Sequence, residues 1–470
     1  MENDVLKCWL NTSNVSSLKK RTRGVHHFVP LGYVSFVYMN IRDKQILHLA
    51  LPSIVSNITV PLLGLVDVAI TGHLGSAAYI GAIAVGGMLF NIIYWMFAFL
   101  RMGTSGMTAQ ALGARDMTEV VAVMQRALLV AIVISGVMLC LQAPIRDGAL
   151  SVIRPSAEVM AFTCTYFNIC IWGAPAALPL FVLTGWFVGM QNSKAPMLVA
   201  IIQNVANIVL SFVLVYVVDM KIEGVAWGTV LAQYIGLISA LSLFIPYYLR
   251  IKKYYRKKVV LAKPALMKFF SLNKDIFFRT CCLILVHFFF IAAGAKQGDS
   301  ELAVNTMLMQ LFTLYSYIMD GFAFAGEAMV GKAIGGKMRG IYDDTVCHLF
   351  RWGWGVAALF TLAYLLLGKP FLSLLTDDAT VLATAQLYQP WTLLFPLCGM
   401  AAFIWDGVYI GATATKGMLI SMASGMLVFF LLYLVLMPLW GNHGLWLAFV
   451  AYLATRGVSQ TWMRHRIWRE

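Results

Sequence analysis

The chain has 470 residues and a mean hydropathy of +0.78, with 60% hydrophobic and only 12% charged residues. Soluble domains carry about 25% charged and about 45–50% apolar residues, so this much apolar surface needs lipid around it. The composition excludes a soluble enzyme, a secreted disulfide scaffold and a disordered chain. The formal charge of +14 lies in short basic runs between long apolar stretches, which indicates membrane topology before nucleic-acid binding.

Twelve apolar stretches are long enough to cross a bilayer, since a helical crossing takes about 20 residues. Residues 1–43 precede them as a cytoplasmic segment without a signal-peptide pattern, and the compact start at Met39 suggests that residues 1–38 are dispensable or untranslated. We expect the spans at 46–72, 78–106, 121–142, 160–189, 196–218, 222–249, 270–296, 301–333, 346–370, 379–412, 418–438 and 442–463. Runs of this length without alternation do not suit a β-barrel, so the sequence predicts an all-α integral membrane protein with twelve transmembrane helices.

The basic residues concentrate in every second loop, as the positive-inside rule requires when both termini are cytoplasmic. The richest run joins the sixth and seventh spans and holds nine Lys and Arg residues between Arg250 and Lys274. The chain therefore divides into a first lobe at 44–249, a basic cytoplasmic linker at 250–269 and a second lobe at 270–470. The linker could contact anionic lipid headgroups, although setting the orientation is the simpler role.

The two halves resemble each other in sequence. The segment "GWFVGMQNSKAPM" (185–197) resembles "GVYIGATATKGML" (407–419), and "QALGAR" (110–115) matches "KAIGGK" (332–337) at the same offset. Each half begins inside and holds an even number of spans, so the repeats are parallel and related by an axis near the membrane normal. Transporters built in this way bind substrate near the midplane and rock between two access states.

Acids inside the spans are the first functional candidates, because one at a helix centre costs about 2.5–3.5 kcal/mol on insertion scales. Asp67 lies deep in the first span on a small, polar helix face. Burial disfavours the charged carboxylate, so Asp67 could take up and release a proton near neutral pH, although neighbouring amides could also satisfy it permanently. Asn204, Asn207 and Ser211 share a face of the fifth span and could hydrogen-bond to it, but helix–helix contact explains them equally well.

Three further acids, Asp320, Glu327 and Asp406, lie in spans of the second half and predict an acidic cavity that attracts cations. Neighbouring aromatic rings could bind an organic cation by cation–π contact: Phe322, Phe324, Trp405 and Tyr409. Arg101 in the second span and Arg279 in the seventh are the bases that could pair with these acids. We expect Arg279 to extend toward the membrane interface instead. For Glu327 and Asp406 the alternatives are a place near the cytoplasmic mouth and a bond to a polar neighbour.

The sequence contains no phosphate-binding loop, no paired metal-ligand spacing and no HExxH or GxSxG motif. It therefore predicts a protein that is not an enzyme, holds no cofactor and draws its energy from an ion gradient. The eight cysteines lie mostly inside apolar stretches and are interpreted as core residues.

Five segments stand in order along residues 43–466: "LALPSIVSNITVPLLGLVDVAITGHLG", "RMGTSGMTAQALGARD", "DGFAFAGEAMVGKAIG", "DGVYIGAT" and "WGNHGLWLAFVAYLATRG". Together they resemble the multidrug and toxic compound extrusion (MATE) family, and more narrowly its DNA-damage-inducible protein F branch. The resemblance implies a V-shaped pair of six-helix lobes and drug efflux coupled to inward H⁺ or Na⁺ flow. It places the proposed protonation site of that branch on Asp67 and an acidic second-lobe site on Asp406 and Glu327. In the fifth span Asn207 matches the family pattern, but Ser211 stands where many relatives have Asp, which favours H⁺ over a Na⁺ site of two carboxylates.

The residues and the resemblance together predict a secondary antiporter of the plasma (inner) membrane. It would export cationic or amphipathic organic compounds in exchange for H⁺, with Na⁺ as the alternative coupling ion. The expected partners are these small molecules and membrane lipid, without nucleic acid, and the chain is expected to act as a monomer. One alternative is a lipid-linked oligosaccharide flippase, which needs cationic cavity residues for a pyrophosphate. The other is an integral-membrane enzyme, which needs a clustered catalytic set.

Overall fold

The computed structural model describes residues 40–72, 77–375 and 379–468, and all regular structure within these ranges is helical. The first half contains α4 (Ile41–Gly72), α5 (Ala77–Met96), α6 (Phe99–Gly113), α7 (Met117–Cys140), α8 (Gln142–Ile153), α9 (Ala157–Cys170), α10 (Ala174–Gly189), α11 (Lys194–Phe212), α12 (Lys221–Ile251) and α13 (Lys257–Val260). The second half contains α14 (Lys263–Ala295), α15 (Asp299–Gly335), α16 (Arg339–Leu375), α17 (Ala379–Gly411), α18 (Thr415–Trp440) and α19 (Asn442–Met463). Four short helical turns, η1 (Ile171–Gly173), η2 (Val213–Val217), η3 (Lys252–Tyr254) and η4 (Arg464–Arg466), continue or join these helices.

The predicted all-α membrane architecture is confirmed. Ten helical segments of 24 to 37 residues are long and apolar enough to cross a bilayer, and the helices α4 and α19 lie where the other two spans were predicted. Two predicted spans consist of consecutive helices, because α5 and α6 form one pass and α9, η1 and α10 form another. Most helices extend beyond the predicted spans, since hydropathy marks only the apolar part of a helix whose ends are polar. For the same reason α14 begins at Lys263, inside the segment predicted as linker.

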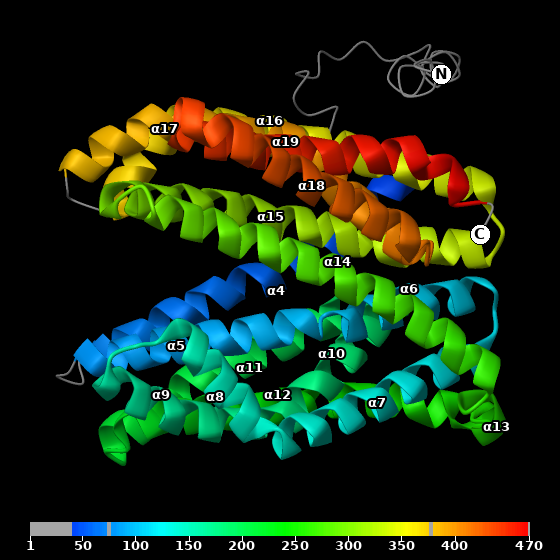
Figure 1. Cartoon of the computed structure of the whole chain (residues 1–470). Helices are drawn as coiled ribbons and strands as arrows, with labels where there is room; N and C mark the ends of the chain where they lie inside the picture. Colours follow the sequence, from blue (N-terminus) through cyan, green and yellow to red (C-terminus); the bar gives the residue numbers. More distant parts are fainter. Residues whose placement is uncertain (1–39, 73–76, 376–378, 469–470) are drawn as a thin grey trace, which may run out of the picture.

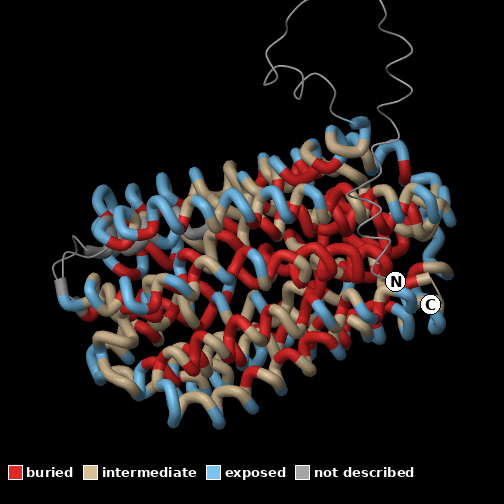
Figure 2. Tube along the Cα trace, turned by 90° about the horizontal axis from the view of Figure 1, so that it is seen from above, coloured by how far each residue is buried: buried red, intermediate tan, exposed pale blue. Residues whose placement is uncertain are grey.

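The helices form two lobes (Figure 1). Helices α4 to α12 pack on one another in the first lobe, for example α11 on α12 and α6 on α10, and α14 to α19 do so in the second, for example α15 on α17 and α18 on α19. Seen from above, buried residues gather in the middle of the molecule and exposed residues lie around the outside (Figure 2). Residues 1–39, which include the segment predicted to be dispensable, lie outside the described residues.

The backbone repeats itself between the lobes. Left-handed conformations occur at Arg115 and Gln191 in the first lobe and at Lys337 and Thr413 in the second, each pair separated by the offset of the sequence repeats. These residues lie in the turns that follow α6, α10, α15 and α17. We call this end of the bundle the basic end, because η3, α13 and their Lys and Arg residues also lie there. Duplicated backbone conformations at matching positions support the predicted pseudo-symmetric lobes.

Glycines fix the same helix contact inside each lobe. Gly185 on α10 lies against the backbone of Arg101 on α6, and Gly407 on α17 lies against the backbone of Ala323 on α15. Both the glycines and the residues they touch are repeat equivalents. A side chain at either glycine would overlap the neighbouring helix, so the close approach of these helices requires glycine.

The lobes meet along α6 and α15, which run side by side. Gly331 lies against Ala109, its own repeat equivalent, so the pseudo-two-fold axis passes between these two helices. Toward the basic end, Gly113 lies against the carbonyl of Lys332 and Gly335 lies against the carbonyl of Gln110. These small residues let the backbones of the two lobes touch, which closes the basic end of the molecule.

Candidate functional site

Asp67 lies on α4, the helix on which the first candidate was predicted. Its side chain lies outside the described residues. The backbone of α4 packs on α11 of its own lobe and on α15 of the other lobe. Asn57 on the same helix donates its amide to the Tyr317 carbonyl of α15 at 3.0 Å, so α4 is bonded across the lobe interface.

The three polar residues of the fifth span lie on α11, and two of them contact α12. The Asn207 amide nitrogen donates to Thr229 Oγ1 on α12 at 3.1 Å, and Ser211 is fully buried against Gly228 of the same helix. The Asn204 amide nitrogen is buried without a hydrogen-bond partner among the described residues. The predicted hydrogen bonds from Asn204, Asn207 and Ser211 to Asp67 stay a prediction. The contacts of Asn207 and Ser211 that the structure describes are with α12.

Asp406 on α17 is held by three side chains from two other helices. Its Oδ2 accepts from Arg279 on α14 and, at 2.8 Å, from Arg456 on α19, while its Oδ1 accepts from Gln460 on α19 at 2.6 Å. The four residues are at most 7% exposed. This cluster therefore joins α14, α17 and α19 inside the second lobe and carries two positive charges for one negative charge.

A second buried ion pair joins the two lobes. Arg101 on α6 donates from Nη1 and Nη2 to the two carboxylate oxygens of Glu327 on α15, at 3.2 and 3.4 Å. The Arg101 guanidinium also lies 3.9 Å above the ring of Phe324, one turn before Glu327. The Glu327 side chain is 1% exposed and the Arg101 side chain is 14% exposed, so the arginine covers the carboxylate.

Asp320 differs from the other two acids of the second lobe. It makes no ion pair or hydrogen bond with any residue in the described ranges, and it is only partly buried. Arg101 and Arg279 both attract it electrostatically. Its neighbour Gly321 lies against the backbone of α4 at Ala50, so Asp320 lies beside the lobe interface.

Two expectations about this region need correction, and one stays a prediction. The acidic cavity of the second lobe stays a prediction, and two of its acids, Glu327 and Asp406, are paired with arginines. Arg279 does not extend toward the interface but lies buried beside Asp406, whose carboxylate accepts a hydrogen bond from it. Tyr409 lines no cavity, because it is 1% exposed and its hydroxyl donates to the Gln460 carbonyl at 2.8 Å.

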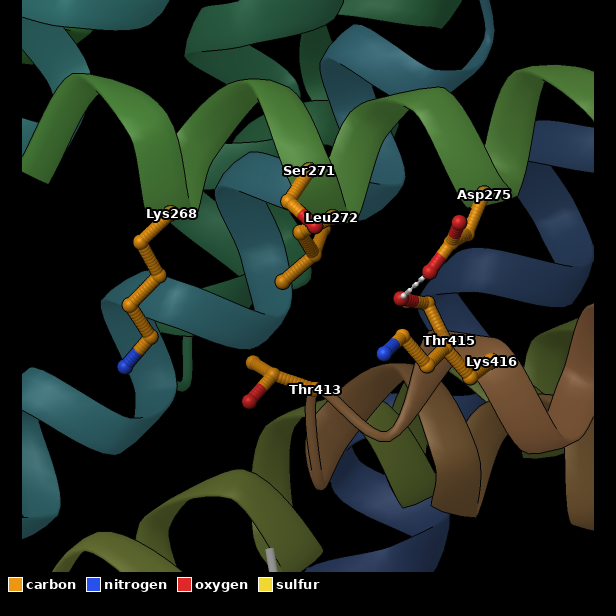
Figure 3. Close-up of a pocket in the computed structure, with 7 residues that line it drawn as sticks. All are labelled: Lys268, Ser271, Leu272, Asp275, Thr413, Thr415 and Lys416. Atoms are coloured by element: carbon orange, nitrogen blue, oxygen red, sulfur yellow. Dashed lines mark hydrogen bonds between the residues drawn. The ribbon is translucent and has the colours of Figure 1, made fainter.

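Sequence reasoning missed two charged residues. Arg456 lies in the predicted span 442–463, where its charge inside an apolar run was the available signal. Asp275 lies on α14, one turn before Arg279, and is 5% exposed. It accepts a hydrogen bond from Thr415 in a cavity of about 320 Å³ at the basic end (Figure 3).

The lining of this cavity is polar and comes from two regions. Lys268, Ser271, Leu272 and Asp275 come from α14, and Thr413, Thr415 and Lys416 come from the turn between α17 and α18 and the start of α18. Within the described ranges, no three His, Cys, Asp or Glu side chains are grouped so that they could hold a metal ion. Six cysteines with described surroundings are not disulfide-bonded: Cys140, Cys164, Cys170, Cys281, Cys282 and Cys398.

A membrane bundle of two equivalent lobes with charged side chains buried at their interface is the architecture of a two-lobed membrane transporter. Comparisons with known proteins give the family. The MatE family model matches this chain twice, at residues 52–213 and 276–435, once in each half. The DNA damage-inducible protein F of Escherichia coli (strain K12) is 37% identical over 439 residues, which cover 93% of this chain and 95% of that protein. The chain therefore belongs to the MATE family of multidrug and toxic compound efflux transporters.

More distant relatives agree with this assignment. The probable multidrug resistance protein NorM of Thermotoga maritima is 22% identical over 73% of this chain and 74% of its own length. The crystal structure of MATE in the bent conformation shares 19% identity and a TM-score of 0.80, covering 91% of this chain and 96% of its own. That likeness shows that the fold is the MATE fold. The relatives are transporters rather than enzymes.

Proposed function

We propose that this protein is a secondary antiporter that exports cationic or amphipathic organic compounds in exchange for protons. The observation that carries the proposal is the place of α4, the helix that bears Asp67. This helix packs on α11 in one lobe and on α15 in the other. A proton that binds to or leaves Asp67 changes the charge on a helix shared by both lobes, so it can favour one arrangement of the lobes over another.

We further propose that the basic end faces the cytoplasm of a bacterial-type inner membrane, with both termini on that side. The support is the concentration of Lys and Arg in η3 and α13, in the turns after α6 and α15, and in the first two residues of α11 and α18. At the same end, Gly113 and Gly335 let the backbones of α6 and α15 touch, which closes this end of the molecule. In this orientation the conformation described here is closed toward the cytoplasm, and substrate would leave on the opposite side.

The test uses proteoliposomes with a pH gradient or a Na⁺ gradient imposed separately, and ethidium as the fluorescent organic cation. We expect the wild type to move ethidium under the pH gradient alone. Asp67→Asn should abolish this movement, because an amide carries no exchangeable proton in this range. Asp147→Asn is the matched control, since the Asp147 side chain is 63% exposed on α8 and should leave transport unchanged.

Each other outcome contradicts part of the proposal. Full pH-driven transport by Asp67→Asn would remove Asp67 from the coupling step. Transport driven by Na⁺ alone would replace the coupling ion. Failure of the wild type to move ethidium and other organic cations under either gradient would reject the substrate class.

A further inference from the structure

The Arg101 guanidinium occupies a site with the chemistry of an organic-cation receptor. A carboxylate, Glu327, accepts hydrogen bonds from both terminal nitrogens of the guanidinium, and the guanidinium carbon lies over an aromatic ring, Phe324, 3.9 Å from the centre of that ring. A ring face and a carboxylate are the two groups that recognise a planar delocalised cation. Glu327 and Phe324 come from consecutive turns of α15, while Arg101 comes from the other lobe.

The fit of Arg101 in this site is loose. Its two hydrogen bonds measure 3.2 and 3.4 Å, whereas charge-assisted bonds of this type are about 2.7–2.9 Å long. The Arg126–Glu119 pair of the first lobe provides an internal comparison, with hydrogen bonds of 2.7 and 3.0 Å. Arg126 is also bonded to the carbonyls of Val259 and Val260, whereas the only hydrogen bonds of the Arg101 side chain among the described residues are those to Glu327.

The exposed fractions of the Arg101 and Glu327 side chains indicate which of the two can be displaced from the ion pair. The Arg101 side chain is 14% exposed and Glu327 is 1% exposed, so the arginine lies between the carboxylate and open space. Asp320, on the same helix two turns earlier, lacks an ion-pair partner among the described residues and is attracted by Arg101. A displaced guanidinium therefore has a second carboxylate to approach, which lowers the cost of leaving Glu327.

We propose that Glu327 and Phe324 form a binding site for planar, delocalised organic cations, and that Arg101 occupies this site until substrate displaces it. This inference rests on the proposed function and adds to it the recognition site. Displacement has a mechanical consequence, because Arg101–Glu327 is the more buried of the two described ion pairs between the lobes; the other is Arg42–Asp344. Binding of a cation to Glu327 thus breaks the Arg101–Glu327 bond and shifts Arg101 toward Asp320, two turns earlier on α15, which changes the contact between α6 and α15.

The test is equilibrium binding of ethidium to the purified protein in detergent at constant pH, without any gradient. Removing an internal competitor frees the binding-competent state, so Arg101→Ala should lower the Kd for ethidium at least about tenfold. Glu327→Gln should raise it at least about tenfold, and the double variant should bind as Glu327→Gln does. Glu119→Gln, which removes the carboxylate of the Arg126–Glu119 pair in the first lobe, should leave the Kd unchanged.

Two further measurements keep the test decisive. Arg101→Lys retains a charge beside Glu327 but loses the flat face, so it should lower the Kd about threefold even if Arg101→Ala does not fold. The neutral planar dye Nile red should bind the wild type and Arg101→Ala equally. A Kd for ethidium that stays the same or rises in both Arg101 variants would overturn the inference.

Failure of this inference can be told apart from failure of the proposed function. If the antiport proposal fails, ethidium does not move across liposomes under a pH gradient, while the shifts in Kd still identify the site. If the site assignment fails, wild-type transport persists and the Arg101 variants bind ethidium no more tightly than the wild type.

Discussion

Asp406 and Arg456 share one ion pair, yet their loss should have very different consequences for stability. Asp406→Asn removes the only negative charge from a cluster in which Arg279 and Arg456 are 7% and 2% exposed. Arg456→Gln removes one of the two positive charges and leaves Asp406 bonded to Arg279 and Gln460. The first change leaves two buried guanidinium groups that repel each other, and the second leaves a neutral pair.

The expected magnitudes follow from this charge arithmetic. Removing one partner of a buried ion pair typically costs about 3–5 kcal/mol, because the other charge stays buried without compensation. Asp406→Asn should reach that range. Arg456→Gln loses a single charge-assisted bond whose acceptor keeps two other donors, so about 1 kcal/mol is expected. In a unit of about 200 residues, 1 kcal/mol corresponds to a Tm change of about 2 °C.

Thermal unfolding in detergent, followed with a thiol-reactive dye, measures both variants, because buried and half-buried cysteines such as Cys170 and Cys398 become reactive on unfolding. Asp406→Asn should lower the Tm by about 6–10 °C and Arg456→Gln by about 2 °C. Equal losses in the two variants would refute the charge argument. An unchanged Tm in Asp406→Asn together with lost transport would show that Asp406 serves transport and not the integrity of the second lobe.

Two further predictions concern packing. Asn305 and Asn442 exchange amide hydrogen bonds of 2.9 Å in each direction, so Asn305→Leu should cost about 1–3 kcal/mol for the orphaned Asn442 amide and lower the Tm in the same assay. Gly335→Leu should push α15 away from the Gln110 carbonyl on α6 and reduce pH-driven efflux of ethidium at least about tenfold. Gly340→Leu is the control, because nothing lies within 4 Å of a Cβ built at that glycine. Equal transport in the two leucine variants would contradict the idea that transport needs the close contact between α6 and α15 at Gly335.

The architecture was accessible from sequence because lipid imposes a simple rule on each span. Apolar length alone located the helices, and the repeated glycine motifs at 185–197 and 407–419 revealed the duplicated lobes. The same glycines mark where helices touch, since Gly185 and Gly407 approach equivalent positions of α6 and α15. Apolar runs and glycine motifs were enough to predict the helices and the two lobes, because each run describes a single helix and each motif describes one helix contact that occurs in both lobes.

The charge pairing was not accessible in the same way. The sequence showed that Asp320, Glu327 and Asp406 lie inside spans, but which of them is neutralised depends on which helix faces meet. Arg456 reaches Asp406 from a helix 50 positions away in the chain, and no local periodicity encodes that contact. The sequence identified Arg101 and Arg279 as bases that could pair with these acids, and the structure shows which acid each one meets: Glu327 for Arg101 and Asp406 for Arg279.

The duplicated scaffold also explains why the interlobe charges are asymmetric. On a pseudo-two-fold axis, a residue of α6 faces its own repeat equivalent on α15, as Ala109 faces Gly331. The equivalent of Glu327 is Ser105, and its side chain lies beside the Glu327 carboxylate. An acid in both positions would bring two like charges together in a site that excludes water, which disfavours ionisation of both. Ser105 in place of an acid avoids this repulsion, and Arg101, whose own equivalent is Ala323, supplies the positive charge that pairs with Glu327. A single ion pair at the axis therefore requires two halves that have diverged, because contacts across a two-fold axis are reciprocal and two identical halves would form such a pair twice or not at all.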